Sequence, residues 1–293
     1  MKNVLIFGGS GLVGSKFNNL LKKEFEIISP PASEVDILNQ DQLMKILEEE
    51  NPSWVINFAA ITDVEGSEKE NGDKDGLCFR VNAIGAQNVA QACKNFNKRL
   101  IHISTEYVFD GTKSDNPYTE EDIPNPINWY GQTKLFGEDF VLESGCEAII
   151  MRISMPFTSH YKLKKDIARF FLEQLKAGNN IKAVEDQRIT PTLVNDIVNA
   201  LRVFLESQSS GIYHVSSRDS VTPLEFAKTI AKTFRLNYSL INSISLDEFS
   251  KNKKAKLLKF SWLNPTKFEK EFGDDILHLV EESLVILKQE VLL

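Results

Sequence analysis

The stretch KNVLIFGGSGLVGSKF, residues 2–17, decides the fold of this chain. An apolar run leads into glycines spaced G-x-G-x-x-G at Gly9, Gly11 and Gly14, and Gly8 also fits G-x-x-G-x-x-G with the last two. The order predicts a strand, a tight turn and a helix. Glycine lets such a turn bend sharply, approach a pyrophosphate and pack the helix on the strand. The stretch therefore predicts a dinucleotide site, with an ordinary tight turn as the alternative.

The free N–H groups at the start of that helix are expected to face the anion. Residues of the same loop are therefore expected to contact the cofactor: Gly8, Ser10, Gly11, Leu12, Val13 and Gly14.

Apolar runs and helical patterns alternate through the first half of the chain. The runs are rich in Val and Ile with little polar alternation, which is typical of parallel strands covered on both faces: 4–8, 25–29, 54–60, 99–104 and 147–153. Repeated βα units predict an α/β fold with a Rossmann-type doubly wound parallel sheet and a smaller C-terminal α/β substrate domain. We expect a dinucleotide-binding domain over 1–153 and mainly a substrate-binding domain over 154–293, with 191–207 packing back on the first.

Bulk properties exclude several classes of protein. The 293 residues carry a net charge of −7, which repels nucleic acid. Three separated cysteines indicate neither a disulfide framework nor a thiolate metal site, and four scattered histidines show no metal-ligand spacing. The chain shows no signal peptide and no stretch of transmembrane length, so we expect a cytoplasmic location, no membrane partner and no bound metal.

The stretch NWYGQTKLFGEDF, residues 128–140, places Tyr130 and Lys134 four positions apart, on one face of an expected helix. An ammonium beside a phenol favours the phenolate and lowers a pKa that is ordinarily about 10. Such a pair can donate a proton to a carbonyl oxygen while a hydride arrives from a nicotinamide. A chance surface pair is the alternative.

A third group, Ser104, Thr105 and Glu106, follows the fourth expected strand. The carboxyl ends of parallel strands are where a doubly wound sheet binds its ligand. A hydroxyl there can hydrogen-bond a substrate carbonyl and stabilise developing negative charge. A loop that satisfies its own backbone is the alternative.

With these elements the chain resembles the extended short-chain dehydrogenase/reductases and, more narrowly, the dTDP-4-dehydrorhamnose reductase family. The resemblance covers most of the chain and is carried by several stretches: NFAAITDVEGSE (57–68), VNAIGAQNVA (81–90), HISTEYVFDGT (102–112), PYTEEDIPNPINWYGQTKLFGE (117–138), EDQRITPT (185–192) and GIYHVS (211–216).

The resemblance implies an NAD(P)H-dependent reductase that transfers a hydride to the C4 ketone of a nucleotide sugar, as a monomer or homodimer. The implied catalytic residues are Thr105, Tyr130 and Lys134, with Glu106 where the family usually has Asp. The implied cofactor contacts are Asp36 and Ile37 near adenine, Ala59, Ala60 and Thr62 along the pyrophosphate and ribose, Ser104, and Ser154 and Met155 beside the nicotinamide. The implied substrate contacts are Thr105, Val108, Phe109 and Arg188.

Several alternatives stay open. The second expected strand ends in IISPP, without the acid that binds a ribose 2′-hydroxyl or an Arg for a 2′-phosphate, so the sequence does not separate NADP from NAD. An epimerase, or a non-catalytic nucleotide-binding subunit like the regulatory subunit of methionine adenosyltransferase, would share these motifs. Arg152 and Arg188 are candidates to bind a diphosphate, with an ion pair as the alternative for each. His102 is expected in the core, and His160 beside the substrate path.

Overall fold

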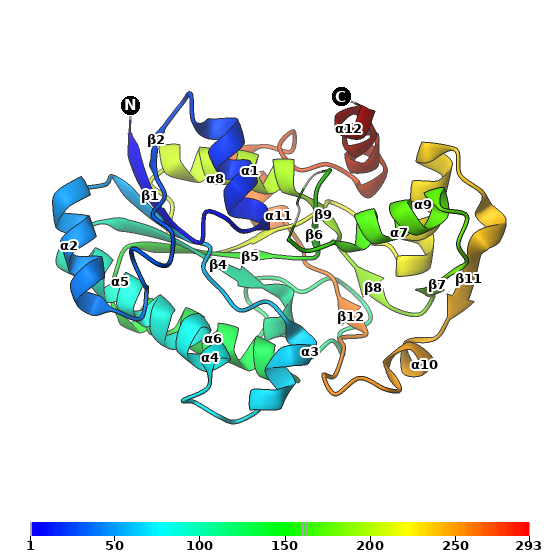
Figure 1. Ribbon diagram of the computed structural model, residues 1–293, viewed down its shortest axis with the longest axis horizontal. Helices are drawn as coiled ribbons and strands as arrows, with labels where there is room; N and C mark the ends of the chain where they lie inside the picture. Colours follow the sequence, from blue (N-terminus) through cyan, green and yellow to red (C-terminus); the bar gives the residue numbers. More distant parts are fainter. Residues whose placement is uncertain (1, 160, 162, 293) are drawn as a thin grey trace. The chain divides into compact units, whose positions relative to one another are not determined.

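The structure is a computed structural model that describes residues 2–159, 161 and 163–292 (Figure 1). His160 therefore lies outside the described residues. The chain divides into two units by its internal contacts. The first consists of Met1–Asp110, Ile123–Arg152 and Leu201–Tyr213, and the second of Gly111–Asp122, Ile153–Ala200 and His214–Leu293.

The first unit is built on a six-stranded sheet with the strand order β10-β5-β4-β3-β1-β2. Its strands are β1 (Asn3–Phe7), β2 (Glu26–Ile28), β3 (Trp54–Asn57), β4 (Arg99–Thr105), β5 (Ala148–Ile153) and β10 (Gly211–Val215). β1 pairs in parallel with both β2 and β3, and β3 pairs in parallel with β4. The chain thus moves to one side of β1 for β2 and to the other for β3. This reversal is the switch point where doubly wound sheets bind ligands.

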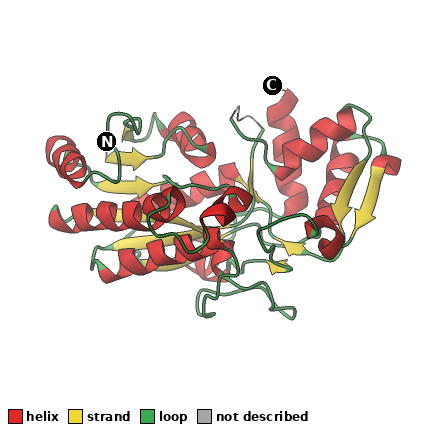
Figure 2. Ribbon diagram, turned by 60° about the horizontal axis from the view of Figure 1, so that its bottom comes forward, coloured by secondary structure: helices red, strands yellow, loops and turns green. Residues whose placement is uncertain are grey.

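Helices cover both faces of this sheet, as the doubly wound prediction requires (Figures 1 and 2). On one face α2 (Gln40–Glu50), α5 (Gly85–Asn95) and α6 (Trp129–Glu143) lie side by side, and α1 (Leu12–Leu21) lies on the other. The core between α2, α5 and the sheet is formed by apolar side chains that include Leu5, Phe7, Leu43, Leu47, Val55, Val89 and Ile150. The Val- and Ile-rich strands are buried because both of their faces are covered.

Short helical turns connect these elements of the first unit. They are α3 (Val64–Ser67), η1 (Glu68–Glu70), α4 (Leu77–Phe79), η2 (Arg80–Ile84) and η3 (Glu106–Val108). η2 is a π-helical turn that runs directly into α5. Such wide turns are rare and often occur at functional sites.

The second unit has its own core, formed by α7 (Ile167–Lys176), α9 (Pro223–Phe234) and α12 (Val280–Leu292) around residues such as Phe157, Leu172, Phe226, Ile230 and Leu284. Its strands form three parallel pairs: β7 (Ile181–Val184) with β11 (Ile241–Ile244), β8 (Arg188–Ile189) with β12 (Phe260–Ser261), and β6 (Pro156–Phe157) with β9 (Thr192–Leu193). Its further helices are α8 (Val194–Glu206), η4 (Tyr238–Leu240), α10 (Leu246–Ser250) and α11 (Thr266–Phe272). A capping box between Thr222 and Glu225 starts α9.

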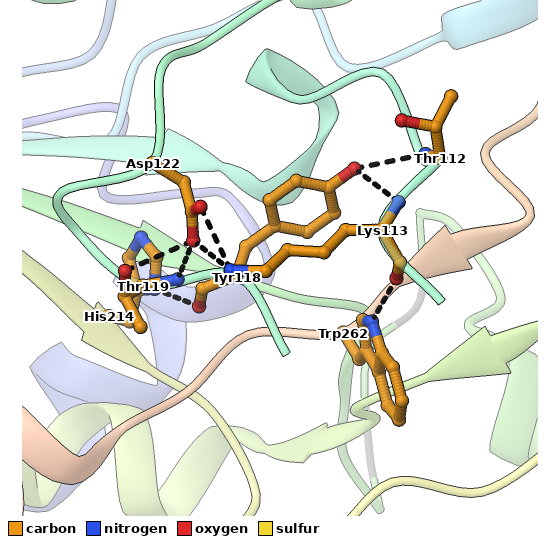
Figure 3. A network of polar contacts seen from close by, with 7 residues as sticks. All are labelled: Thr112, Lys113, Tyr118, Thr119, Asp122, His214 and Trp262. Carbon is orange, nitrogen blue, oxygen red and sulfur yellow. Dashed lines mark hydrogen bonds and ion pairs between the residues drawn. The ribbon is translucent and has the colours of Figure 1, made fainter. Parts of the chain in front are cut away.

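Two segments lie on the other side of the boundary expected at 153/154: Leu201–Tyr213 belongs to the first unit, and Gly111–Asp122 belongs to the second. Backbone bonds tie it there: Tyr118 N donates to Trp262 O at 2.9 Å, and Asn264 N donates to Tyr118 O at 2.8 Å. Figure 3 shows the side chains that hold its shape, including the Tyr118 hydroxyl, which accepts from two backbone N–H groups, and the ion pair of Lys113 with Asp122 at 2.6 Å.

The end of α8 and the segment after it belong to the first unit. Lys2 Nζ donates to Leu205 O at 2.9 Å, and Arg99 donates to Ser207 O and Ser209 O, each at 2.6 Å. The domain bounds expected from the sequence, with 191–207 on the first domain, stay a prediction.

Over the part of the chain that the structure describes, no helix is long and apolar enough to cross a membrane.

Candidate active site

The glycine loop has the geometry of a dinucleotide turn. Gly8 has φ +78°, and a Cβ placed there would lie 2.6 Å from Ala59 N, so only glycine fits between the ends of β1 and β3. A Cβ at Gly14 would lie 2.8 Å from Gly8 O, which explains how α1 packs closely against the turn. Gly11 is the N-cap of α1 and, within the described residues, no side chain caps its first turn. The first N–H groups of α1 are therefore suited to an anionic ligand.

The loop after β3 begins beside this turn, where Ala59 lies against Gly8. Cofactor contacts by Ala59, Ala60 and Thr62 stay predictions. Asn57 accepts from Ala59 N at 3.1 Å. Asn82, buried in the π-helical turn η2, accepts from Ile61 N at 2.8 Å and donates to Ile61 O and Thr133 Oγ1, each at 3.0 Å. Asn82 thus joins the loop to helix α6. The sequence reasoning did not single out Asn82, although a polar residue in the apolar stretch VNAIGA was a usable signal.

The predicted adenine contacts lie between β2 and α2. Asp36 is exposed, its carboxylate accepts from Leu38 N at 2.9 Å, and its own N donates to Gln42 Oε1 at 2.8 Å. Ile37 is buried, and its carbonyl accepts from Asn88 Nδ2 at 3.0 Å. Gln42 of α2 and Asn88 of α5 thus hold the backbone of these two residues, but contact with a cofactor stays a prediction.

Tyr130 and Lys134 share one face of α6, as predicted. The helix starts at a defined residue because Asn128 Oδ1 accepts from Gly131 N at 2.9 Å. Glu68 Oε1 accepts from Trp129 N at 2.5 Å and fixes the same turn. Tyr130 therefore lies in the first turn of a helix whose position is determined by two side-chain bonds.

The hydroxyl of Thr105 connects Tyr130 to Glu106. Thr105 Oγ1 donates to Glu106 Oε2 at 2.7 Å and is hydrogen-bonded to the Tyr130 side chain. Thr105 Oγ1 thus lies between the Tyr130 phenol and the Glu106 carboxylate. Tyr107 packs edge-on against Tyr130 with ring centroids 5.6 Å apart. The structure thus brings together Thr105, Glu106 and Tyr130, all of them buried.

The prediction that Lys134 lowers the pKa of Tyr130 is wrong for this structure. Burial raises the pKa of Tyr130 above its ordinary value, the Glu106 carboxylate raises it further, and the hydrogen bond with Thr105 offsets this only partly. Lys134 Nζ instead donates to Ile103 O at 2.7 Å. The phenol is therefore neutral at ordinary pH, which is the state that a proton donor needs before it reacts.

Lys134 is buried, and its ammonium lies beside a histidine side chain. Its Nζ lies 3.5 Å from His102 Nε2, and His102 Nδ1 lies 3.4 Å from Asn57 Nδ2. Burial lowers the pKa of Lys134 to about 8, although the nearby Glu138 carboxylate raises it. Burial, followed by the charge of Lys134, lowers the pKa of His102 well below its usual value. His102 is thus a neutral core histidine, as expected.

A buried ion pair lies one turn further along α6. Arg152 Nη2 from β5 contacts Glu138 Oε2 at 2.6 Å, and Arg152 Nε contacts both carboxylate oxygens, at 2.9 and 3.2 Å. Ser104 Oγ also donates to Glu138. The diphosphate role considered for Arg152 is therefore wrong, because its guanidinium is engaged inside the first unit. Glu138 was missed by sequence reasoning, although an arginine in the apolar run EAIIMRI requires a buried partner.

The remaining predicted residues differ in their burial and in the unit to which they belong. Val108 and Phe109 are fully buried, and their substrate contacts stay predictions. Ser154, Met155 and Arg188 belong to the second unit. Met155 has φ +39°, which is uncommon outside glycine. Arg188 forms a half-exposed ion pair with Glu225 at 3.3 Å. Cofactor or substrate contacts by these three residues stay predictions.

No group of three or more potential metal ligands occurs among residues 2–159, 161 and 163–292.

Known proteins share this sequence and fold. The sequence model of the RmlD substrate binding domain family matches residues 1–289. dTDP-4-dehydrorhamnose reductase from Aggregatibacter actinomycetemcomitans is 31% identical, over 93% of this chain and 94% of its own. Methionine adenosyltransferase 2 subunit beta from Rattus norvegicus is 29% identical, over 83% of this chain and 75% of its own.

Among solved structures, dTDP-4-dehydrorhamnose reductase from Bacillus anthracis in complex with NADP superposes with a TM-score of 0.90. It is 31% identical and covers 99% of this chain and 100% of its own. The match over nearly the full length, together with the glycine turn and the Tyr130–Lys134 helix, leads to one conclusion: this chain belongs to the dTDP-4-dehydrorhamnose reductase family of extended short-chain dehydrogenase/reductases.

Proposed function

We propose that the chain is an NAD(P)H-dependent reductase that converts the C4 ketone of a nucleotide sugar to an alcohol. The observation that carries this proposal is the buried, neutral phenol of Tyr130, which is hydrogen-bonded to Thr105 and lies on α6, the helix that also bears Lys134. A reductase needs such a protonated group, because the ketone oxygen gains a proton as the carbon gains a hydride.

The cofactor fits residues that are present. Gly8, Gly11 and Gly14 add no side chains to the turn at the start of α1, and Ala59 borders it. These residues would hold the pyrophosphate, and the bound nicotinamide supplies the hydride. The relative from Bacillus anthracis is in complex with NADP. In this chain Ser29, Pro30 and Pro31 follow β2 and carry no carboxylate that would repel a 2′-phosphate, so we favour NADPH.

The roles of the side chains follow from their contacts. Tyr130 holds its proton at Oη and releases it to the substrate oxygen. Thr105 orients that hydroxyl, and Glu106 in turn holds Thr105 through the bond at 2.7 Å. Lys134, as an ammonium, would bind the hydroxyls of the nicotinamide ribose and stabilise the phenolate that the reaction leaves behind. Ser154, Met155 and Arg188, from the second unit, are proposed for the nicotinamide side and the sugar nucleotide.

The test is a panel of nucleotide-linked 4-keto sugars, dTDP-4-dehydrorhamnose among them, mixed with NADPH or NADH and followed by the near-ultraviolet absorbance of the reduced cofactor. We expect loss of absorbance that requires both ketone and enzyme. Tyr130→Phe should abolish it. Tyr213→Phe is the matched control, because Tyr213, on β10, is also buried but packs against Phe204 of α8. Absence of oxidation with every ketone would contradict the proposal.

A second candidate is a nucleotide-binding regulatory subunit, favoured by the 29% identity to methionine adenosyltransferase 2 subunit beta. That function predicts binding of the cofactor without turnover, together with a stable protein partner. The epimerase alternative predicts turnover without net oxidation of added NADPH. Light scattering on the same preparation tests the proposed monomer or homodimer.

A further inference from the structure

The buried ion pair of Glu138 and Arg152 has no place in the roles assigned above. The side chain of Glu138 is 1% exposed and that of Arg152 2% exposed. The Arg152 guanidinium also lies 5.2 Å from the ring centroid of Phe109, so it is sandwiched between a carboxylate and an aromatic face. Removing two charges from water costs several kcal/mol per ion, and apolar pairs of similar volume are often as stable. Stability alone therefore does not explain why the pair occupies this position.

The position of the pair indicates a role beside Lys134. Tyr130, Lys134 and Glu138 follow one another at intervals of four residues and so lie along one face of α6. Arg152 lies near the end of β5, and Ser104 lies near the end of β4. The carboxylate of Glu138 is thus bonded to both strand ends, while its charge acts on the next ionisable group along the helix.

We propose that Glu138 is a positioning residue for the reduction: held by Arg152 and Ser104, its carboxylate fixes α6 against the ends of β4 and β5 and keeps Lys134 in its ammonium form. This inference rests on the proposed function for its role in catalysis. The effect of the Glu138 charge on the protonation of Lys134 does not depend on that function, and it is measured without any substrate.

Among the described residues, several other ionisable groups lie near Lys134 or its neighbours. His102 on β4 is neutral and Cys78 is on α4; Tyr130 precedes Lys134 on α6, and Glu106 on η3 lies beyond Tyr130. Burial lowers the pKa of Lys134, and Glu138 is the main opposing influence. Loss of its charge should therefore deprotonate Lys134 at lower pH.

The test follows the titration of Lys134 directly. Protein labelled with ¹³C at lysine Cε is titrated by NMR, and the Lys134 signal is identified by its absence in Lys134→Met. Glu138→Gln leaves Arg152 as a buried, unpaired cation and risks unfolding. The double variant Glu138→Gln with Arg152→Gln keeps the pair neutral. Asp139→Asn is the matched control, since it removes the same charge from the next, exposed position of the helix.

The wild-type midpoint is expected at about 8. In Glu138→Gln it should fall by roughly one pH unit or more, and in the double variant it should fall by less, because Arg152 no longer repels Lys134. Asp139→Asn should match the wild type. A folded double variant whose midpoint equals that of Asp139→Asn would overturn the proposal, whether or not the single variant folds.

The role in catalysis has a separate readout. If kcat/KM of the wild type falls as Lys134 loses its proton, the alkaline limb of the double variant should move to lower pH by the same amount as the NMR midpoint. A purely structural pair would lower the rate at every pH without moving the limb, and that result would overturn the catalytic part. Absence of turnover in the wild type contradicts the proposed function, but the NMR shift still decides the charge of Lys134.

Discussion

Replacement of Lys134 by Met should make the protein more stable near neutral pH while removing its activity. Met has a similar shape and no charge, and Lys134 is only 2% exposed. Burial lowers the pKa of this lysine from 10.5 to about 8. At 1.36 kcal/mol per pKa unit, a shift of that size corresponds to about 3 kcal/mol of unfavourable burial. The lost hydrogen bond to Ile103 O, worth roughly 1.5–3 kcal/mol, offsets much of this gain.

The dependence on pH is the sharper consequence. Between pH 8 and 10.5 the unfolded chain binds more protons at this residue than the folded chain does. The stability of the wild type therefore rises with pH through that window, and the unfavourable burial is complete only below pH 8. The advantage of Lys134→Met should shrink by about 1 kcal/mol between pH 7 and pH 9.

Urea unfolding of both proteins at pH 7, 8 and 9 measures this difference. Tyr107, Tyr130 and Cys93, whose pKa values burial raises, titrate in both proteins, so their effects largely cancel in the comparison. Lys22→Met, at an exposed position just after α1, is the control and should give a difference that does not change with pH. If the difference in the free energy of unfolding between Lys134→Met and the wild type is the same at all three pH values, the reasoning is refuted.

Three further substitutions test other parts of the site. Tyr130→Phe should reduce kcat by roughly 10²–10⁴-fold, the range for loss of a general acid, while a fluorescence titration finds nearly unchanged cofactor affinity; wild-type turnover would rule out the proton-donor role. Gly11→Val should abolish cofactor binding, because even a Cβ at that position lies 3.2 Å from Gly8 O and the branched side chain would fill the turn; an unaltered titration would count against the glycine site. Arg152→Met should lower the free energy of unfolding, measured in urea, by about 3–5 kcal/mol, because Glu138 is left as a buried, unpaired anion. A decrease below about 1 kcal/mol would show that the pair is not desolvated.

Much of the fold was predictable because its signals are local. The first strand, the glycine turn and α1 occupy consecutive residues, and each depends on neighbours within a few positions. The spacing of Tyr130 and Lys134 likewise needs only the helical period. The steric reason for Gly8, by contrast, is the backbone of Ala59, which lies in the loop after β3.

The electrostatics of the site were not predictable in the same way. The sequence places an ammonium four residues from a phenol, but it does not show that both are buried or that Lys134 donates to Ile103 O. Burial then dominates the pKa of each group and reverses the expected direction for Tyr130. Burial depends on the packing of distant elements, and no local pattern reports it.

Long-range polar contacts account for the remaining differences. Arg152 was weighed between diphosphate binding and an ion pair. Its partner Glu138 lies on the preceding helix, and Ser104, which also binds Glu138, lies on a third element. The polar stretch 111–122 was expected within the first domain. Its assignment to the second unit depends on bonds between Tyr118 and the backbone around residues 262–264, which local composition cannot reveal.

The central claim is that this site delivers a hydride to a sugar ketone while Tyr130 supplies the proton. Isotope transfer tests this most directly: NADPH carrying deuterium at the transferred position of its nicotinamide is incubated with enzyme and a 4-keto nucleotide sugar, and the product is examined by mass spectrometry and NMR. We predict one deuterium at C4 of the sugar for each cofactor oxidised, and none in the Tyr130→Phe variant. A product without deuterium at C4, or an oxidised cofactor that has not labelled the sugar, would contradict the account.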